Sequence, residues 1–269
     1  MAFQSILLVG CGNMGGAMLA GWLAGGIPAA NFTIADPRLE AAPDGVTLVR
    51  EIPAEGHFDA ILLSVKPQML GDIAARVEPL AGPEATILSI LAGVELATLA
   101  ERFPRAAAVV RIMPNLAAAL GKSPVALVGA GLSDEAPGAI DALMAPLGTA
   151  EWLEREDLMD VVTALAGSGP AFVYRFIDAL AQGATALGLP AAQAQRLALS
   201  TVEGAAALAA SSEHSPGELA RRVASPGGTT QAGLDILDSG EALARLIEDT
   251  LRGARDRSAE MAVEARKQA

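Results

Sequence analysis

A loop near residue 230 combines two glycines with three hydroxyl side chains and carries no charge. It reads Ser225-Pro226-Gly227-Gly228-Thr229-Thr230 and leads into residues 231–237, which continue as a helical pattern. Such a loop can direct several backbone N–H groups at one point, and the N-terminus of the following helix favours an anion there. Because no Arg or Lys lies within it, the loop suits a small carboxylate better than a polyphosphate.

Another glycine-rich loop, the first one along the chain, suits a dinucleotide. It reads Gly10-Cys11-Gly12-Asn13-Met14-Gly15-Gly16, follows an apolar run and precedes a helical pattern, which is the context that a G-x-G-x-x-G motif requires. Gly10 permits the tight turn, Gly12 lets the backbone approach a pyrophosphate, and Gly15 lets the helix pack closely on the strand. We interpret Cys11 as a small apolar loop residue rather than a nucleophile.

Two charged residues after the second predicted strand, at 32–35, bear on the choice of nicotinamide cofactor. Asp36 lies 20 residues after Gly16 (36 − 16), where an acidic side chain is expected to contact the hydroxyls of the adenine ribose. It favours NAD, because a 2′-phosphate would meet its carboxylate. Arg38 favours NADP instead, since a guanidinium can pair with that phosphate. The sequence therefore predicts NADPH or NADH as cofactor and leaves the preference open.

Three further strand ends are predicted to line the same crevice, because ligands of open parallel sheets bind beyond the carboxyl ends of the strands. Gly93 can let a cofactor approach the backbone, and the Asn115 side chain can bond the nicotinamide amide. Each segment taken alone can equally be an ordinary loop whose Gly or Pro only ends the strand and contacts no ligand. The segments are Ser64-Val65-Lys66-Pro67, Leu91-Ala92-Gly93 and Met113-Pro114-Asn115.

The order of the hydrophobic patterns predicts two domains. Up to residue 153, short apolar strands alternate with helical patterns, which is typical of a mostly parallel, doubly wound α/β sheet. From residue 154 onward only helical patterns follow, the longest at 170–187, 191–210 and 241–266. We therefore predict an N-terminal Rossmann-type dinucleotide-binding domain (1–153) followed by an all-helical C-terminal domain (154–269).

The composition limits the partners and the compartment. Hydrophobic residues make up 52% of the 269 residues and aromatic residues 3%, so we expect an aliphatic, alanine-rich core. The formal net charge of −12 argues against nucleic acid and anionic membrane surfaces as partners. The single cysteine excludes an intramolecular disulfide and fits a reducing compartment. The sequence shows no signal peptide and no uninterrupted apolar run of about 18–20 residues, so we expect a cytoplasmic protein, and we predict no metal site.

Taken together, these motifs resemble those of the pyrroline-5-carboxylate reductase family, in order and over nearly the whole chain. The motif at 10–15 is shared with many dehydrogenases, whereas the glycine-containing segments after residue 153 are specific. Leu116-Ala117 stands where the family usually has Thr-Pro, so cofactor orientation or substrate scope can differ here. Besides the two loops, the resemblance is carried by Val65-Lys66-Pro67, Ala92-Gly93-Val94, Arg111 with Met113-Pro114-Asn115, and Gly167-Ser168-Gly169-Pro170-Ala171.

The resemblance implies hydride transfer from NAD(P)H to the imine carbon of 1-pyrroline-5-carboxylate, which gives proline and is the last step of proline biosynthesis. It also implies that the helical domain binds the substrate and forms homodimers or larger homo-oligomers. In this sequence Thr230 would hydrogen-bond the ring nitrogen, and Glu213 matches a family position close to the substrate. The residues that would hold the substrate carboxylate are Ser225, Gly227, Gly228 and Thr229.

Two alternative functions stay open on the sequence. A β-hydroxyacid dehydrogenase shares only the first motif, and its reaction needs a lysine base in a glycine-rich helix of the second domain. The lysines of this chain are Lys66, Lys122 and Lys267, none of which lies within 167–187. A non-catalytic dinucleotide-binding sensor or structural protein would bind the cofactor without turnover, and the intact loop at 225–230 argues against it.

Overall fold

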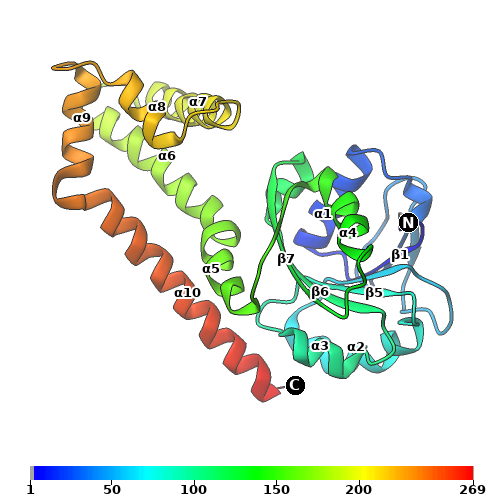
Figure 1. The fold of residues 1–269 in the computed structure, drawn as a ribbon. Coiled ribbons are helices and arrows are strands. Elements are labelled where there is room, and N and C mark those ends of the chain that lie inside the picture. Colours follow the sequence, from blue (N-terminus) through cyan, green and yellow to red (C-terminus); the bar gives the residue numbers. More distant parts are fainter. Residues whose placement is uncertain (1–2, 269) are drawn as a thin grey trace. The chain divides into compact units, whose positions relative to one another are not determined.

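The computed structural model describes residues 3–268, and their side chains as far as residue 263. The chain divides into two compact units (Figure 1): unit 1 comprises Met1–Gly167 with Ala254–Ala269, and unit 2 comprises Ser168–Gly253. The last part of the helical region thus packs with the unit that contains the sheet. The domain boundary predicted after residue 153 stays a prediction.

Unit 1 is built on an eight-stranded sheet with the order β3-β2-β1-β4-β5-β6-β7-β8. Neighbouring strands are parallel except β6 and β7, which are antiparallel. The chain runs outward from β1 to β3 and then returns to β4 on the other side of β1, which makes a topological switch point beside β1. The strands are β1 (Ile6–Val9), β2 (Phe32–Ala35), β3 (Thr47–Val49), β4 (Ala60–Leu63), β5 (Thr86–Ser89), β6 (Ala108–Met113), β7 (Ser123–Ala130) and β8 (Gly148–Trp152).

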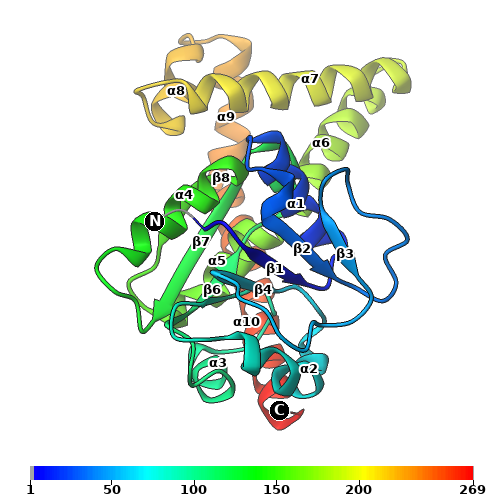
Figure 2. The ribbon, with the colours of Figure 1, turned by 90° about the vertical axis from the view of Figure 1, so that its right-hand side faces the viewer.

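Helices cover both faces of this sheet, with α1 and α4 on one face and α2 and α3 on the other (Figures 1 and 2). Ile6 and Leu8 of β1 pack in the cluster with residues of α1 and α4, whereas Leu7 and Val9 pack with residues of α2 and α3. Successive strand residues point to opposite faces, so a strand covered on both sides is apolar throughout. The sheet confirms the predicted doubly wound α/β class. The helices are α1 (Asn13–Ala24), α2 (Leu70–Val77), α3 (Leu96–Arg102), α4 (Ala136–Met144) and α5 (Met159–Val162).

Trp22 anchors the first helix to the sheet. Its buried ring stacks on Phe32 of β2 with 5.4 Å between the ring centroids, and its indole N–H donates to the Leu143 carbonyl of α4 at 2.7 Å. A buried Trp combines a large apolar contact area with one satisfied donor. Because α1 begins directly after the first glycine-rich loop, this anchor also fixes the position of that loop beyond the end of β1.

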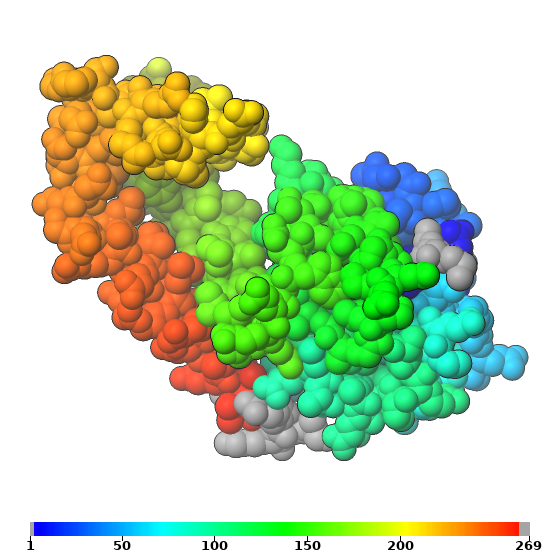
Figure 3. Space-filling model, viewed as in Figure 1, coloured from blue at the N-terminus to red at the C-terminus, as the bar shows by residue number. Residues whose placement is uncertain are grey.

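Unit 2 is helical and has a small core. Its buried cluster consists of Ala181, Ala194 and Ala198, where α6 and α7 pack together. Large apolar side chains stay exposed, among them Ile236 of α9 and Leu246 of α10, on helices that lie in orange on the surface in Figure 3. Within the described residues, no helix is both long and apolar enough to cross a membrane. The helices are α6 (Gly169–Ala186), α7 (Ala191–Ala210), α8 (Pro216–Val223), α9 (Thr229–Asp238) and the first part of α10 (Ala242–Gln268).

Candidate active site

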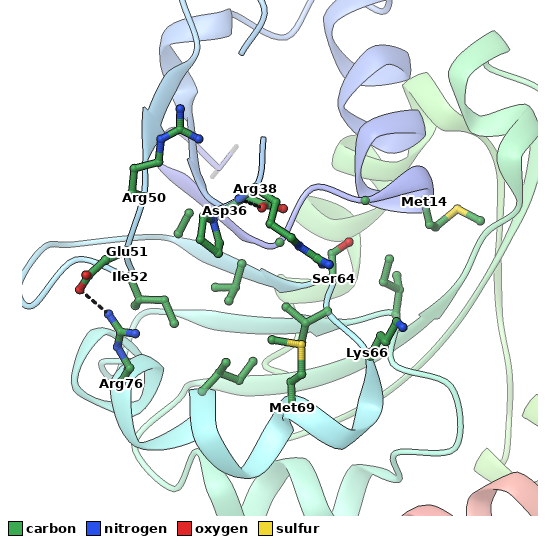
Figure 4. Close-up of a pocket in the computed structure, with 18 of the residues that line it drawn as sticks. Met14, Asp36, Arg38, Arg50, Glu51, Ile52, Ser64, Lys66, Met69 and Arg76 are labelled. Carbon is green, nitrogen blue, oxygen red and sulfur yellow. Dashed lines mark hydrogen bonds and ion pairs between the residues drawn. The ribbon is translucent and has the colours of Figure 1, made fainter. Parts of the chain in front are cut away.

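A cavity of about 890 Å³ opens in unit 1 beyond the carboxyl ends of β1, β2 and β4 (Figure 4). This is the switch point of the sheet, where ligands of doubly wound folds bind. Most of the residues predicted for the dinucleotide line it. They are Gly10, Gly12, Asn13, Met14, Asp36, Arg38, Ser64, Val65 and Lys66.

The three glycines of the G-x-G-x-x-G motif in the first loop differ in what surrounds them. Gly10 has a φ of +85°, and a Cβ placed on it would lie 2.7 Å from the carbonyl oxygen of Ser64. A Cβ on Gly15 would clash with the Ser64 hydroxyl, so close packing of α1 on the end of β4 requires glycine there. A Cβ on Gly12 would meet nothing within 4 Å, although this residue lines the cavity. Gly12 therefore leaves space for a ligand, whereas glycine at positions 10 and 15 is required by packing within the protein.

The Ser64 hydroxyl is a buried polar group that lacks a partner. It lies at the end of β4 and lines the cavity, and within the described residues its Oγ has no hydrogen bond. A buried hydroxyl without a partner costs free energy unless a ligand or water satisfies it. Together with the open side of Gly12 and the N-terminus of α1, it fits the pyrophosphate of a dinucleotide.

Asp36 ties the first loop to the end of β2. Its Oδ2 accepts from the Cys11 N–H at 2.8 Å, and its Oδ1 accepts from the N–H groups of Arg38 at 2.8 Å and Leu39 at 3.3 Å. Burial raises the pKa of this carboxyl, but the three backbone donors and the Arg38 guanidinium lower it by more, so its pKa lies below the ordinary value. Asp36 is therefore ionised at neutral pH and holds two loops of the cavity together.

Cys11 has the character of a structural loop residue. Burial and the neighbouring Asp36 carboxylate raise the pKa of its thiol. The thiol therefore stays protonated at neutral pH, whereas a nucleophile must form the thiolate.

Several residues predicted to contact the cofactor do not line the cavity. At Gly93, with φ +75°, a Cβ would lie 3.0 Å from Cα of Ala262, so the backbone of α10 takes the adjacent space. The buried Asn115 amide donates to the Ala166 carbonyl at 3.0 Å and accepts from the Ala117 N–H at 2.9 Å. These two bonds use one N–H and one lone pair of the amide, which leaves one of each for a ligand, and the nicotinamide contact at Asn115 stays a prediction. The other residues outside the lining are Cys11, Gly15, Pro67 and Ala92.

A buried ion pair supports the loop after β5, and its acidic member was not predicted. Arg111 of β6 donates to Oε1 of Glu156 at 2.6 Å, and the same oxygen accepts from the Leu96 N–H at the start of α3 at 2.7 Å. The Arg111 side chain is 9% exposed and that of Glu156 is 29% exposed. The contacts span 45 and 60 residues of chain, so no local pattern indicated them. The pair joins β6, α3 and the approach to α5.

The second glycine-rich loop, in unit 2, presents backbone donors at the start of α9. The helical ladder begins with the bond from the Ala232 N–H to the Gly228 carbonyl at 3.1 Å, so the N–H groups of residues 229–231 precede it and have no intrahelical acceptor. The Gly228 N–H itself donates to the Ser225 carbonyl at 2.9 Å, and Gly227 has a φ of +72°. Gly228 is thus the N-cap of α9, without a side chain to occupy the donors.

The hydroxyl groups of this loop are available to a ligand. Ser225, Thr229 and Thr230 are exposed, and their hydroxyls form no hydrogen bond within the part of the chain that the structure describes. Glu213 lies exposed in the turn between α7 and α8. The ring of the adjacent His214 contacts the Arg222 guanidinium. The predicted contacts of Glu213 and of the hydroxyls with a substrate stay predictions.

Comparison with known proteins identifies relatives over nearly the whole chain. A pyrroline-5-carboxylate reductase dimerisation model matches residues 156–261, and a model of NADP oxidoreductase, coenzyme F420-dependent, matches residues 5–93. The chain is 38% identical to a pyrroline-5-carboxylate reductase of Pseudomonas aeruginosa over 269 aligned residues, which cover 97% of this chain and 98% of that protein.

Solved structures agree with these matches. A pyrroline-5-carboxylate reductase from Coxiella burnetii is 26% identical with a TM-score of 0.87, covering 96% of this chain and 98% of the other. A pyrroline carboxylate reductase of Plasmodium falciparum, solved with NADP bound, has the same fold at 23% identity and a TM-score of 0.79, with the same coverage of 96% and 98%.

Proposed function

We propose that this chain, which belongs to the pyrroline-5-carboxylate reductase family, reduces 1-pyrroline-5-carboxylate to proline with NAD(P)H. The family predicted from the sequence motifs is confirmed. The observation that carries the proposal is that similarity extends over 97% of the chain and so includes both glycine-rich loops. A non-catalytic relative has no need of both.

The residues of unit 1 are suited to hold the cofactor. The open side of Gly12 and the N-terminus of α1 accept the pyrophosphate, and the Ser64 hydroxyl supplies a donor that has no hydrogen-bond partner among the described residues. Asp36 keeps the two loops at the adenosine end in register. When bound, the reduced nicotinamide supplies a hydride to the substrate.

The residues of unit 2 are suited to hold the substrate. The N–H groups of residues 229–231 and the Ser225 and Thr229 hydroxyls form the carboxylate clamp, at the positive end of the α9 dipole. The Thr230 hydroxyl hydrogen-bonds the ring nitrogen. An iminium is already a good hydride acceptor, so the reaction needs placement and electrostatic support more than a strong general acid.

The exposed apolar side chains of unit 2 support a homo-oligomer, in agreement with the match to a dimerisation family. A core of three alanines buries too little apolar surface to stabilise helices of this length, while large apolar side chains stay exposed. We propose a homodimer formed through these helices, with the apolar faces of one copy buried against those of the other. Size-exclusion chromatography with light scattering should give twice the monomer mass or a multiple of it.

Turnover is tested by following reduced-nicotinamide absorbance after addition of pyrroline-5-carboxylate, in parallel with NADPH and NADH. Rapid loss with proline as product supports the proposal. Protein that binds either cofactor but shows no turnover would instead be a non-catalytic dinucleotide-binding protein. The matched control is Thr230→Ala, which removes the hydroxyl and keeps the cofactor cavity intact.

A further inference from the structure

The cavity has a net charge of opposite sign to that of the whole chain. Six ionisable side chains line it, four cationic and two acidic, which gives a local net charge of +2 in a chain whose formal net charge is −12. An excess of positive charge at one site concentrates anionic ligands there. The six are Asp36, Arg38, Arg50, Glu51, Lys66 and Arg76.

The arginines differ in how far they are already engaged. Arg76 pairs with Glu51 at 3.2 Å, drawn as a dashed line in Figure 4. Arg50 donates to the backbone carbonyls of Leu39 and Glu40 and thereby pins that segment. Arg38 extends from the end of β2 into the cavity, and among the described residues its guanidinium has neither a hydrogen bond nor an ion pair.

The Asp36 carboxylate, unlike the Arg38 guanidinium, is already hydrogen-bonded within the protein. Both carboxylate oxygens accept from backbone N–H groups, those of Cys11, Arg38 and Leu39. A carboxylate offers about four acceptor positions, so three of them are used within the fold. Its negative charge is therefore largely compensated by the backbone and by the nearby guanidinium, and little of it is directed at a ligand.

We propose that Arg38 binds the 2′-phosphate of NADPH, and that Asp36 acts as a clasp between the two loops rather than as a barrier to that phosphate. The inference rests on the proposed function only in taking the cavity as the dinucleotide site. A guanidinium can donate two parallel hydrogen bonds to a phosphate, and hydrogen bonds to charged groups are the strong ones. Arg38 is the arginine of the cavity best placed for this, because Arg50 and Arg76 are committed elsewhere. The fourth cation, Lys66, follows β4 and has no planar fork of donors.

The test is equilibrium binding without imino acid substrate, using NADPH and NADH and the fragment pair 2′,5′-ADP and 5′-AMP. Arg38→Gln should weaken NADPH and 2′,5′-ADP by about ten- to a hundredfold and leave NADH and 5′-AMP within about twofold. The preference of the parent protein for NADPH should fall as salt is raised, and Arg38→Gln should lose most of this dependence. Arg105→Gln, a surface arginine of the same unit that pairs with Glu78 away from the cavity, is the matched control.

The role of Asp36 is separated by Asp36→Asn. An amide in place of the carboxylate sets an N–H donor against backbone donors, so both cofactors should bind more weakly and by a similar factor. A selective gain for NADPH of more than about tenfold would show that Asp36 is a barrier and would overturn that half of the proposal. Equal losses of NADPH and NADH in Arg38→Gln, or no loss, would overturn the role of Arg38.

These outcomes are distinct from failure of the proposed function. If Arg38→Gln loses NADPH selectively but the parent protein does not reduce pyrroline-5-carboxylate, the phosphate site stands and the reaction is wrong. If the parent protein turns over and Arg38→Gln keeps its preference for NADPH, the reaction stands and the phosphate site is wrong.

Discussion

Replacing Glu156 by Gln should destabilise unit 1, because it removes the charge that compensates a buried guanidinium. In the structure one carboxylate oxygen accepts from both Arg111 at 2.6 Å and the Leu96 N–H at 2.7 Å. Removing one partner of a fully buried pair costs about 3–5 kcal/mol. The Glu156 side chain is 29% exposed, so water partly screens the loss, and we expect about 2–3 kcal/mol.

Tryptophan fluorescence reports this change directly, because both tryptophans of the chain, Trp22 and Trp152, lie in unit 1. A loss of about 2–3 kcal/mol should lower the thermal midpoint by about 4–10 °C for a unit of this size. Glu154→Gln removes an exposed carboxylate two residues away and should stay within about 0.5 kcal/mol of the parent. A Glu156→Gln midpoint equal to that of Glu154→Gln would show that the Glu156 carboxylate does not stabilise the buried Arg111 guanidinium.

A double substitution separates the ion pair from a general effect on packing. Arg111→Met with Glu156→Leu replaces both charges by apolar side chains of similar size. Apolar replacements of buried pairs are often neutral or stabilising, so the double variant should be more stable than Glu156→Gln alone. A further loss of stability would mean that the hydrogen bond to Leu96 outweighs the charge.

Three further substitutions test the two loops. Gly12→Val should weaken cofactor binding by more than about a hundredfold but leave the thermal midpoint unchanged, since a Cβ there meets nothing within 4 Å. Gly15→Val should weaken cofactor binding and also lower the thermal midpoint, because its side chain clashes with Ser64. Thr230→Ala should lower kcat/KM by about ten- to a hundredfold while cofactor affinity stays within about twofold, and unchanged turnover would remove Thr230 from the mechanism. The lowered pKa of the Asp36 carboxyl stabilises the folded protein above the unfolded-state pKa of about 3.9, and this contribution is lost as the pH falls through the lower folded-state pKa. The difference in free energy of unfolding between the parent and Asp36→Asn should therefore narrow from pH 5 to pH 3. A difference that stays constant in urea unfolding would contradict this.

Elements with a strong residue pattern could be predicted from the sequence. The predicted strand at 32–35 and the predicted helix at 191–210 agree with Phe32–Ala35 and Ala191–Ala210, since β-branched and aromatic residues mark the first and alanine the second. The helices Leu70–Val77 and Pro216–Val223 were not predicted. Each has eight residues, too few for a helical period to stand out. Pro67 lies just before the first of them, and Pro216 begins the second.

The site was predictable where the motif itself dictates the backbone. The glycines at 10, 12 and 15 and the acid at 36 lie where the Rossmann pattern requires them, because spacing along the chain fixes their positions at the ends of β1 and β2. A glycine in the sequence indicates that some group can approach closely but not which group does so. At Gly93 that group is the backbone of α10 at Ala262, which is far away in the sequence. Partners of this kind depend on tertiary packing, which no local pattern records.

The activity is tested most directly by single-turnover reduction of 1-pyrroline-5-carboxylate by the protein preloaded with NADPH. In the parent protein, cofactor oxidation and proline formation should occur together, with one proline for each NADPH oxidised, and both should be far slower in Thr230→Ala. Cofactor that stays reduced in the presence of the imine, in protein shown to bind both NADPH and substrate, would contradict the central claim that this chain is a pyrroline-5-carboxylate reductase in activity as well as in family.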